Sequence, residues 1–439
     1  MAETENAAPT RARQRVLAFI LALIAIAYLD RVCISTAAPA IRTDLGLSDG
    51  QMGLVFSAFT LAYALFEVPS GWFADRFGAR LSLTRIVVWW SAMTAATGLA
   101  TGFASLASIR LLFGAGEAGV FPATARAYAR WLPTAERGGA FGLAIMTGAL
   151  GGAVTQPLVA TLLGVISWRL AFAIFGSVGV VWAAAWWRWF RDDPREHSGV
   201  NAAELREIAE GGAETRHGEA VPWGALLSNP PFLALCAMYA GAIYGWYFYL
   251  TWLPTYLLRA RGFDLRQAGW LSALPLLAIA VGVFLGGWSS DRLVARFGQR
   301  AGRRASGLFG LPAAALAIVG GVTTADPWLA AWLLAAAAGL AALAVAPAWA
   351  AALEIGGVHA GVVTGAMNMC GNLGGALSPV VVGYCLERWG SWQAPLFSVA
   401  ALYLFSALCW LAVDPTRTID SESRALTRPR AETVPSRTR

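Results

Sequence analysis

The sequence predicts an all-α membrane protein in which twelve transmembrane helices form two related six-helix bundles. Hydrophobic residues make up 57% of the 439 positions and charged residues only 13%, about half the charged share of soluble domains. The apolar residues gather in runs of roughly 20, the length that a helix needs to cross a bilayer core. A repeated sequence pattern then relates the first six runs to the last six.

Short polar connections separate most of the apolar runs, so each run is expected to be one transmembrane helix. One longer polar segment divides them into six and six. We expect a cytoplasmic arm at 1–15, a first bundle at 16–190, a cytoplasmic central loop at 191–229, a second bundle at 230–414 and a cytoplasmic tail at 415–439. The expected spans are 16–38, 52–72, 81–102, 105–131, 139–163, 168–190, 232–258, 267–290, 305–323, 327–353, 360–386 and 391–413.

Two pairs of segments carry the internal repeat. Residues 142–153 and 365–376 are identical at seven of twelve positions. The run Gly71-Trp72-Phe73-Ala74-Asp75-Arg76 returns as Gly287-Trp288-Ser289-Ser290-Asp291-Arg292. These matches place span two opposite span eight, and span five opposite span eleven. Parallel six-helix repeats with a site at their interface are one of the common architectures of membrane transporters.

The basic residues set the expected orientation. All 33 of them are Arg. With a cytoplasmic N-terminus, the cytoplasmic side holds fourteen of the arginines considered and the other side mainly six, which is the positive-inside pattern. We therefore expect both termini and the central loop in the cytoplasm of a bacterium, with the protein in its inner membrane. The net charge of +7 does not indicate nucleic-acid binding, because the arginines form no basic stripe.

Four charged residues lie inside expected spans: Asp30 and Arg31 in span one, and Arg110 and Glu117 in span four. A charge in the bilayer is costly unless it is paired or faces water. Arginine matches the geometry of a carboxylate and keeps its proton, whereas a carboxyl group can exchange one. We predict that Arg31 and Arg110 bind an organic carboxylate, and that Asp30 and Glu117 couple its movement to protons. Structural ion pairs between helices are the alternative.

Neutral polar residues are candidates for further substrate contacts. Asn372 stands where the first repeat has Ala149, so this helix face is polar in one half only. Tyr28, Tyr63 and Gln156 offer hydroxyl and amide groups in the first half. Hydrogen bonding between helices is the alternative role for each of them.

Several motifs resemble those of a known family. Gly71-x-x-x-Asp75-Arg76-x-Gly78-x-Arg80, with its second copy at 287–292, resembles the cytoplasmic loop motif of the major facilitator superfamily. Four more resemble the anion:cation symporter family within it. They are Tyr28-x-Asp30-Arg31, Arg110-x-x-x-Gly114-x-Gly116-Glu117-x-Gly119, Pro194-x-Glu196-His197 and Thr251-Trp252-Leu253-Pro254-Thr255-Tyr256-Leu257. The resemblance covers about residues 15 to 415. It implies the major facilitator fold and the transport of small organic anions such as sugar acids, in bacteria usually with protons.

Charged residues near the cytoplasmic ends of spans two and eight are expected to act in gating. Glu67 stands where many members of that family have Gln, and we expect a hydrogen-bonding or gate role, with proton coupling as the alternative. Asp75 with Arg76, and Asp291 with Arg292, are expected to make contacts between the halves that break and reform.

The predicted function is proton-coupled uptake of a small organic anion by alternating access, in which two bundles rock around a central cavity. We expect a monomer in the lipid bilayer, without cofactor or metal, that is not an enzyme. A membrane-embedded enzyme would need a catalytic cluster that we do not find, and a sensor usually carries a soluble signalling domain. A drug:proton antiporter is the closest alternative, but two intramembrane arginines suit anions better than cationic drugs.

Overall fold

The computed structural model describes residues 8–209 and 223–418, and within them it contains helices and no strands. The predicted fold class is confirmed. The first half contains α1 (Ala12–Leu45), α2 (Asp49–Thr97), α3 (Phe103–Glu117), α4 (Val120–Trp131), α5 (Thr134–Leu163) and α6 (Trp168–Trp189). The second contains α9 (Pro230–Thr251), α10 (Leu253–Arg261), α11 (Leu265–Phe297), α12 (Gln299–Thr323), α13 (Pro327–Ala342), α14 (Val345–Gly356), α15 (Ala360–Trp389) and α16 (Gln393–Trp410). Between the halves lie η1 (Pro194–Glu196), α7 (Ala202–Ala209) and α8 (Trp223–Leu227), and η2 (Gly357–His359) precedes α15.

The helices account for the expected spans. Eleven helices among the described residues are long and apolar enough to cross a membrane. One of them, α2, has 49 residues, about 74 Å at 1.5 Å per residue and more than twice a bilayer core. It breaks at Gly78, whose φ of 83° and ψ of 168° are not helical. Because α2 holds two spans, the helices match the twelve that the sequence predicts.

Three expected spans are each divided into two helices. The fourth breaks between α3 and α4, the seventh between α9 and α10, and the tenth between α13 and α14. The sequence predicts each of these as one continuous helix, because apolar composition does not reveal a local change of backbone direction. Broken helices within a membrane are tolerated where they are buried or line a cavity.

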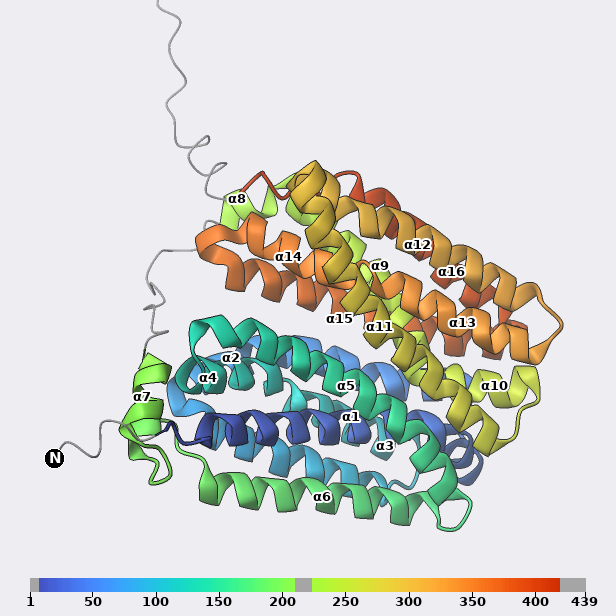
Figure 1. Cartoon of the computed structure of the whole chain (residues 1–439). Helices are drawn as coiled ribbons and strands as arrows, with labels where there is room; N and C mark the ends of the chain where they lie inside the picture. Colours follow the sequence, from blue (N-terminus) through green and yellow to red (C-terminus); the bar gives the residue numbers. More distant parts are fainter. Residues whose placement is uncertain (1–7, 210–222, 419–439) are drawn as a thin grey trace, which may run out of the picture.

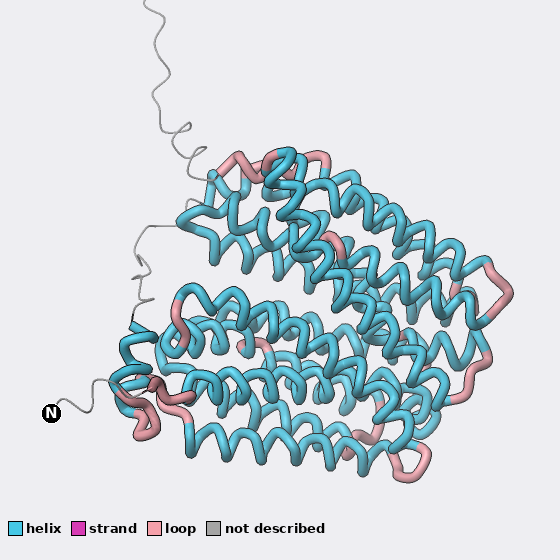
Figure 2. The backbone as a smooth tube through the Cα atoms, in the orientation of Figure 1, coloured by secondary structure: helices cyan, strands magenta, loops and turns pink. Residues whose placement is uncertain are grey.

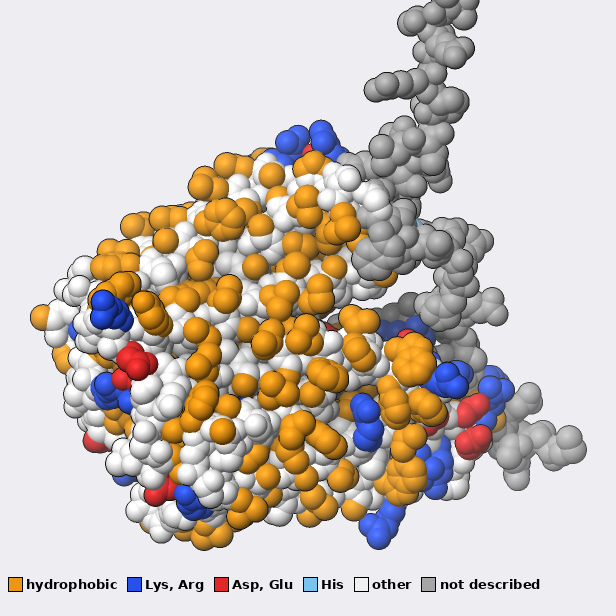
Figure 3. All heavy atoms as spheres, turned by 180° about the vertical axis from the view of Figure 1, so that it is seen from behind, with side chains coloured by type: hydrophobic (Ala, Val, Ile, Leu, Met, Phe, Trp, Pro, Cys, Tyr) orange, Lys and Arg blue, Asp and Glu red, His pale blue; other side chains and the backbone are white. Residues whose placement is uncertain are grey.

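The outer surface is apolar around the middle of the molecule. Figure 3 shows hydrophobic side chains over this middle region, with charged side chains gathered toward the two ends. Large exposed residues contribute, such as Leu316 at 74% and Phe284 at 69% exposure. Such an extended apolar surface suits contact with lipid and not with water. The chain is therefore a multi-pass membrane protein.

The same contact between a glycine and a tyrosine ring occurs in both halves. In the first half, α5 packs on α1, and a Cβ added to Gly148 would lie 2.5 Å from a ring carbon of Tyr28. In the second half, α15 packs on α9, and a Cβ added to the equivalent Gly371 would lie 2.5 Å from the ring of Tyr239. Glycines thus admit an aromatic ring from the first helix of each half, because small residues let helices approach closely.

The halves join at one end of the molecule and diverge toward the other. Figures 1 and 2 show them side by side near α10, and spreading apart toward the end that carries α7 and α8. The main contacts between halves are α2 with α15 and α5 with α11. Contacts of α5 with α11 lie in the α5 segment nearer α10, where Gly152 meets Leu276 and Gly269 meets Ala160. We call these the α10 end and the α7 end.

Helix α7 from the central segment is attached to the start of α1. The Glu204 carboxylate accepts hydrogen bonds from the backbone N–H groups of Ala12 and Arg13, at 3.2 and 2.9 Å. Arg13 also pairs with Glu207. A carboxylate at a helix N-terminus stabilises the helix by meeting its unpaired N–H groups. Parts of the expected arm, central loop and tail (1–7, 210–222 and 419–439) lie outside the described residues.

Candidate functional site

A buried ion pair between α1 and α3 lies at the centre of the candidate site. The Arg31 guanidinium donates through Nη2 to Oε1 of Glu117. The Glu117 side chain is 1% exposed and that of Arg31 is 13% exposed. Two residues that the sequence predicts separately, as anion ligand and proton carrier, are thus direct partners. The second Glu117 oxygen, Oε2, has no hydrogen-bond partner.

The break between α3 and α4 places Glu117 at a helix end. Glu117 is the last residue of α3, and the Ala118–Gly119 turn leads directly into α4. A carboxylate at a helix C-terminus faces the negative end of the helix dipole, which is unfavourable. Arg31 supplies the opposing charge. The acid is therefore held where its ionised form depends on that arginine.

Aromatic rings enclose both arginines. The guanidinium carbon of Arg31 lies 5.0 Å from the Tyr63 ring centroid, 5.1 Å from that of Phe59 and 5.2 Å from that of Tyr28. The Arg110 guanidinium lies 5.0 Å from the same Phe59 ring and 4.4 Å from Phe113. Ring faces attract cations and exclude water, so both guanidinium groups are held with few competing hydrogen bonds.

Asp30 and Arg110 form the second acid and arginine of the site. Both are buried, with 0% and 2% exposure. Neither oxygen of Asp30 has a hydrogen-bond partner, and neither has Arg110 Nε. Asp30 interacts electrostatically with Arg110 and with Glu117. The adjacent Asp30 and Arg31 therefore serve different partners on α3, as their divergence on one helix predicts.

The second half contributes neutral groups. Tyr247 of α9 donates its hydroxyl to Asn372 of α15 at 3.3 Å and lies close enough to Arg31 for an electrostatic interaction. One turn before Asn372, the Asn368 amide donates to both carboxylate oxygens of Glu67 at 2.9 and 3.0 Å. Glu67 thus bonds directly across the two halves. The hydrogen-bonding role expected for it has a partner that the sequence did not identify.

Gln156 makes its hydrogen bonds within the first half. It is fully buried on α5, where its Oε1 accepts from Thr36 and its Nε2 donates to Ser35 at 3.4 Å. This matches the alternative role of hydrogen bonding between helices, and substrate contact by Gln156 stays a prediction. Tyr28 and Tyr63, in contrast, lie against Arg31.

The repeated motif residues make contacts within their own halves. Asp75 lies 3.5 Å from Arg126, both in the first half. Asp291 pairs with Arg303 at 2.7 Å in the second half, and Arg303 also pairs with Glu354 at 2.7 Å. The remaining two, Arg76 and Arg292, lie over the neighbouring rings of Trp72 and Trp288. Contacts between the halves by these motif residues remain a prediction.

Sequence reasoning missed Phe59, which touches both arginines. Its position one turn before Tyr63 on the same face of α2 was a usable signal, because residues four apart share a helix face. For metals, the described residues contain no group of three or more His, Cys, Asp or Glu side chains placed to hold an ion.

Two helical bundles related by an internal repeat, with buried arginines and acids in the first bundle, are typical of a polytopic membrane transporter. The chain belongs to the Major Facilitator Superfamily, whose family model matches residues 20–298 and 293–435.

Curated relatives extend over nearly the whole chain. The probable sulfoacetate transporter SauU of Cupriavidus necator is 40% identical, over 94% of this chain and 96% of its own length. The D-galactonate transporter of Escherichia coli is 32% identical, over 92% and 96%. The hexuronate transporter of Bacillus subtilis is 30% identical, over 90% and 92%. The predicted family is confirmed as that of organic-anion and sugar-acid transporters within this superfamily.

A solved structure shares the fold. It is described as a bacterial homologue of the human lysosomal transporter Spinster, in an inward-facing and occupied conformation. The TM-score is 0.71 at 22% identity, with 94% of this chain and 97% of that chain covered. At this identity the likeness concerns the fold alone.

Proposed function

We propose that this protein is a secondary active transporter that carries a small organic anion together with protons. The observation that supports this most is the Arg31–Glu117 ion pair, which is buried among aromatic rings where the two halves meet. A guanidinium that pairs with an acid in one state can exchange that acid for a substrate anion in another. The names of relatives support the choice of cargo, since they transport sulfoacetate, galactonate and hexuronates.

The proposed exchange links anion binding to protonation. When Glu117 and Asp30 carry protons, Arg31 and Arg110 are free to bind the anionic groups of the substrate. When the protons leave, the carboxylates compete for the guanidinium groups and expel the anion. The Arg31–Glu117 pair is the arrangement expected after release.

The proposed orientation places the α7 end in the cytoplasm of a bacterium, because arginine-rich connections lie at that end. The halves join at the α10 end and spread at the α7 end, so the conformation would be open inward. Asp30 and Glu117 are buried in this conformation, so the proposal has water from the cytoplasm reach them only when the cavity opens further on that side. This is the state in which the proposal has protons leave.

The cargo class is proposed to be anions of a few carbons that carry a carboxylate or sulfonate group. Both groups present planar or tetrahedral sets of oxygens that a guanidinium fork can bind. Amide and hydroxyl groups of Asn372 and Tyr247 face the site from the second half, where they can bond to hydroxyl groups or a second anionic group of the substrate.

A counterflow experiment tests this proposal. Proteoliposomes containing the purified protein are loaded with unlabelled sulfoacetate, galactonate or glucuronate. A trace of the same compound in radiolabelled form is then added outside. We expect exchange of at least one anion above the level of protein-free liposomes. Exchange of a lipophilic cationic dye, with none of the anions moving, would contradict the proposal and favour a drug antiporter.

A further inference from the structure

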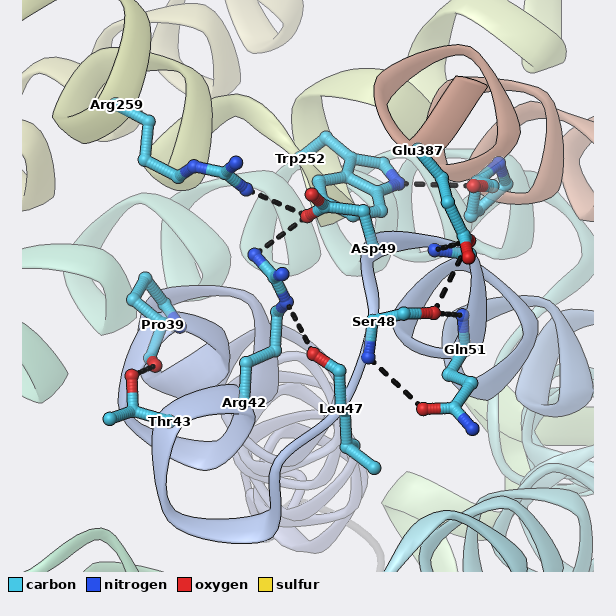
Figure 4. Close-up of polar contacts among 12 residues, drawn as sticks. Pro39, Arg42, Thr43, Leu47, Ser48, Asp49, Gln51, Trp252, Arg259 and Glu387 are labelled. Atoms are coloured by element: carbon cyan, nitrogen blue, oxygen red, sulfur yellow. Dashed lines mark hydrogen bonds and ion pairs between the residues drawn. The ribbon is translucent and has the colours of Figure 1, made fainter. Parts of the chain in front are cut away.

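A cluster of charged side chains at the α10 end joins the two halves. Asp49, the first residue of α2, shares its Oδ1 between Arg42 at 2.6 Å and Arg259 at 2.7 Å. Arg42 belongs to α1 in the same half, whereas Arg259 belongs to α10 in the other half. Figure 4 shows both guanidinium groups converging on this one carboxylate.

A second carboxylate, from the second half, binds groups of the first half. Glu387, near the end of α15, accepts from the backbone N–H of Gly50 at 3.0 Å and from the Ser48 hydroxyl at 3.2 Å. These groups form the N-terminus of α2, which Ser48 and Gln51 also cap (Figure 4). A carboxylate is stabilised at a helix N-terminus by the unpaired N–H groups and the helix dipole. The start of α2 is thus held by the other half from two sides.

Close backbone packing lies directly beneath the cluster. A Cβ on Gly53 would overlap the carbonyl oxygen of Pro379, and the Ser57 hydroxyl donates to the carbonyl of Ala376 at 2.5 Å. The Phe56 and Trp252 rings pack edge to face at 5.6 Å. These contacts pack α2 directly against α15 and the start of α10. Anything that enters from the α10 end must first separate the halves here.

We propose that Asp49, Arg259 and Glu387 form the gate that closes the α10 end, and that Arg42 holds Asp49 when the gate opens. Arg259 and Glu387 leave with the second half when the halves separate. Arg42 lies seven residues before Asp49 in the same half, so it remains beside the carboxylate. Opening therefore breaks one of the two ion pairs of Asp49 and leaves that buried carboxylate paired with Arg42. Glu387 exchanges its bonds to Ser48 and Gly50 for water.

This inference goes beyond the proposed function, because it concerns the α10 end and because the second of its two tests needs no substrate. The chain supplies a matched control. Asp44 and Arg169 form an ion pair of 2.9 Å at the same end, but both belong to the first half. A link between Asp44 and Arg169 restrains no movement between the halves.

The first test uses a short bifunctional thiol reagent in a variant whose five native cysteines are replaced. With Asp49→Cys/Arg259→Cys, cross-linking should lower the counterflow rate at least tenfold relative to the same protein before linking. With Asp44→Cys/Arg169→Cys, linked and unlinked proteins should transport equally. Transport that persists after complete linkage of residues 49 and 259 would overturn the proposal.

The second test measures accessibility and does not depend on activity. Ser57→Cys is labelled in the same background with a membrane-impermeant maleimide applied from the α10 side. Arg259→Gln should raise the labelling rate roughly 2- to 5-fold, as expected for loss of a partly exposed ion pair. Arg169→Gln should leave the rate unchanged. Equal rates in the two variants would show that Arg259 does not hold the gate closed.

Discussion

At the residue scale, the candidate site is a set of two arginines and two acids on α1 and α3 with unequal pairing. Arg31 is bonded directly to Glu117, whereas Asp30 makes no direct ion pair and interacts electrostatically with Arg110 and Glu117. Trp90 and Thr94 are buried beside Asp30, close enough for their side chains to interact with its carboxylate. Small side-chain rotations would therefore let Asp30 exchange partners. The proposed exchange of partners during transport requires such rotations.

Replacing either arginine by Lys tests the anion site. Lys keeps the charge but presents a point charge instead of a planar fork. Loss of a charged hydrogen bond to the substrate costs about 1.5–3 kcal/mol, so we expect counterflow efficiency to fall roughly 10- to 100-fold in Arg31→Lys and Arg110→Lys. Initial counterflow rates over a range of substrate concentrations measure this. Near-normal efficiency in both variants, at equal protein levels, would remove these arginines from the site.

Neutralising the acids tests the coupling. Gln at position 117 imitates protonated Glu117, so substrate exchange should persist in Glu117→Gln while proton-driven accumulation is lost. Asp30→Asn should behave similarly, with weaker binding if Asp30 also positions Arg31. Counterflow and accumulation driven by a pH gradient are measured on the same proteoliposomes. Full accumulation in both variants would show that other groups couple the protons.

At the element scale, glycines determine how closely α15 packs on α9. The ring of Tyr239 lies against Gly371 and is fixed by a hydrogen bond from Trp349 at 3.0 Å. On the same helix, a Cβ on Gly365 meets nothing within 4 Å. The two glycines thus differ in their surroundings while sharing one helix.

Alanine substitution at these two glycines should have opposite effects. Ala favours a helix over Gly by about 1 kcal/mol, so Gly365→Ala should be neutral or stabilising. In Gly371→Ala the methyl group forces the buried ring to move, at a cost of about 1–3 kcal/mol. We expect a lower melting temperature for Gly371→Ala, measured by thermal unfolding in detergent. A melting temperature at or above that of Gly365→Ala would contradict this packing.

Elements could be predicted from the sequence to different degrees. Apolar runs identify the spans because their length is set by the bilayer, and the glycine repeat identifies α5 and α15 as equivalents. The break after Glu117 was missed, because it depends on backbone angles at Ala118 and Gly119 that composition does not encode. The charged residues of the site were predicted from their cost in lipid. Their pairing was not, since partners on separate helices depend on how these helices rotate about their axes.

At the scale of the whole molecule, one helix makes the polar contacts between the halves. Among the described residues, the hydrogen bonds and ion pairs that join the two bundles involve α2 or its cap, at Ser48, Asp49, Gly50, Ser57 and Glu67. Their partners lie on α10 and α15. Sequence analysis predicted a hydrogen-bonding or gate role for Glu67 without its partner in the other half. It did not predict the α10-end cluster, because Arg259 and Glu387 are far from Asp49 along the chain. In the proposed mechanism, movement of one half against the other breaks these contacts of α2.

The orientation predicts which ends are labelled from each side. Ser198 is exposed near the α7 end, and Thr101 is exposed in the connection between α2 and α3 at the opposite end. In cells expressing single-cysteine variants, an impermeant maleimide should label Thr101→Cys from outside, and Ser198→Cys only after permeabilisation. Labelling of Ser198→Cys in intact cells would contradict the proposed topology.

Accumulation driven by a pH gradient tests the central claim most directly. Proteoliposomes with an alkaline interior are mixed with a labelled anion that the counterflow panel has identified, with sodium absent and the membrane potential clamped at zero. Proton symport predicts that the anion concentrates inside several-fold above the medium, and that a protonophore abolishes this. Equilibration without concentration, or concentration only when a sodium gradient is imposed, would contradict proton coupling.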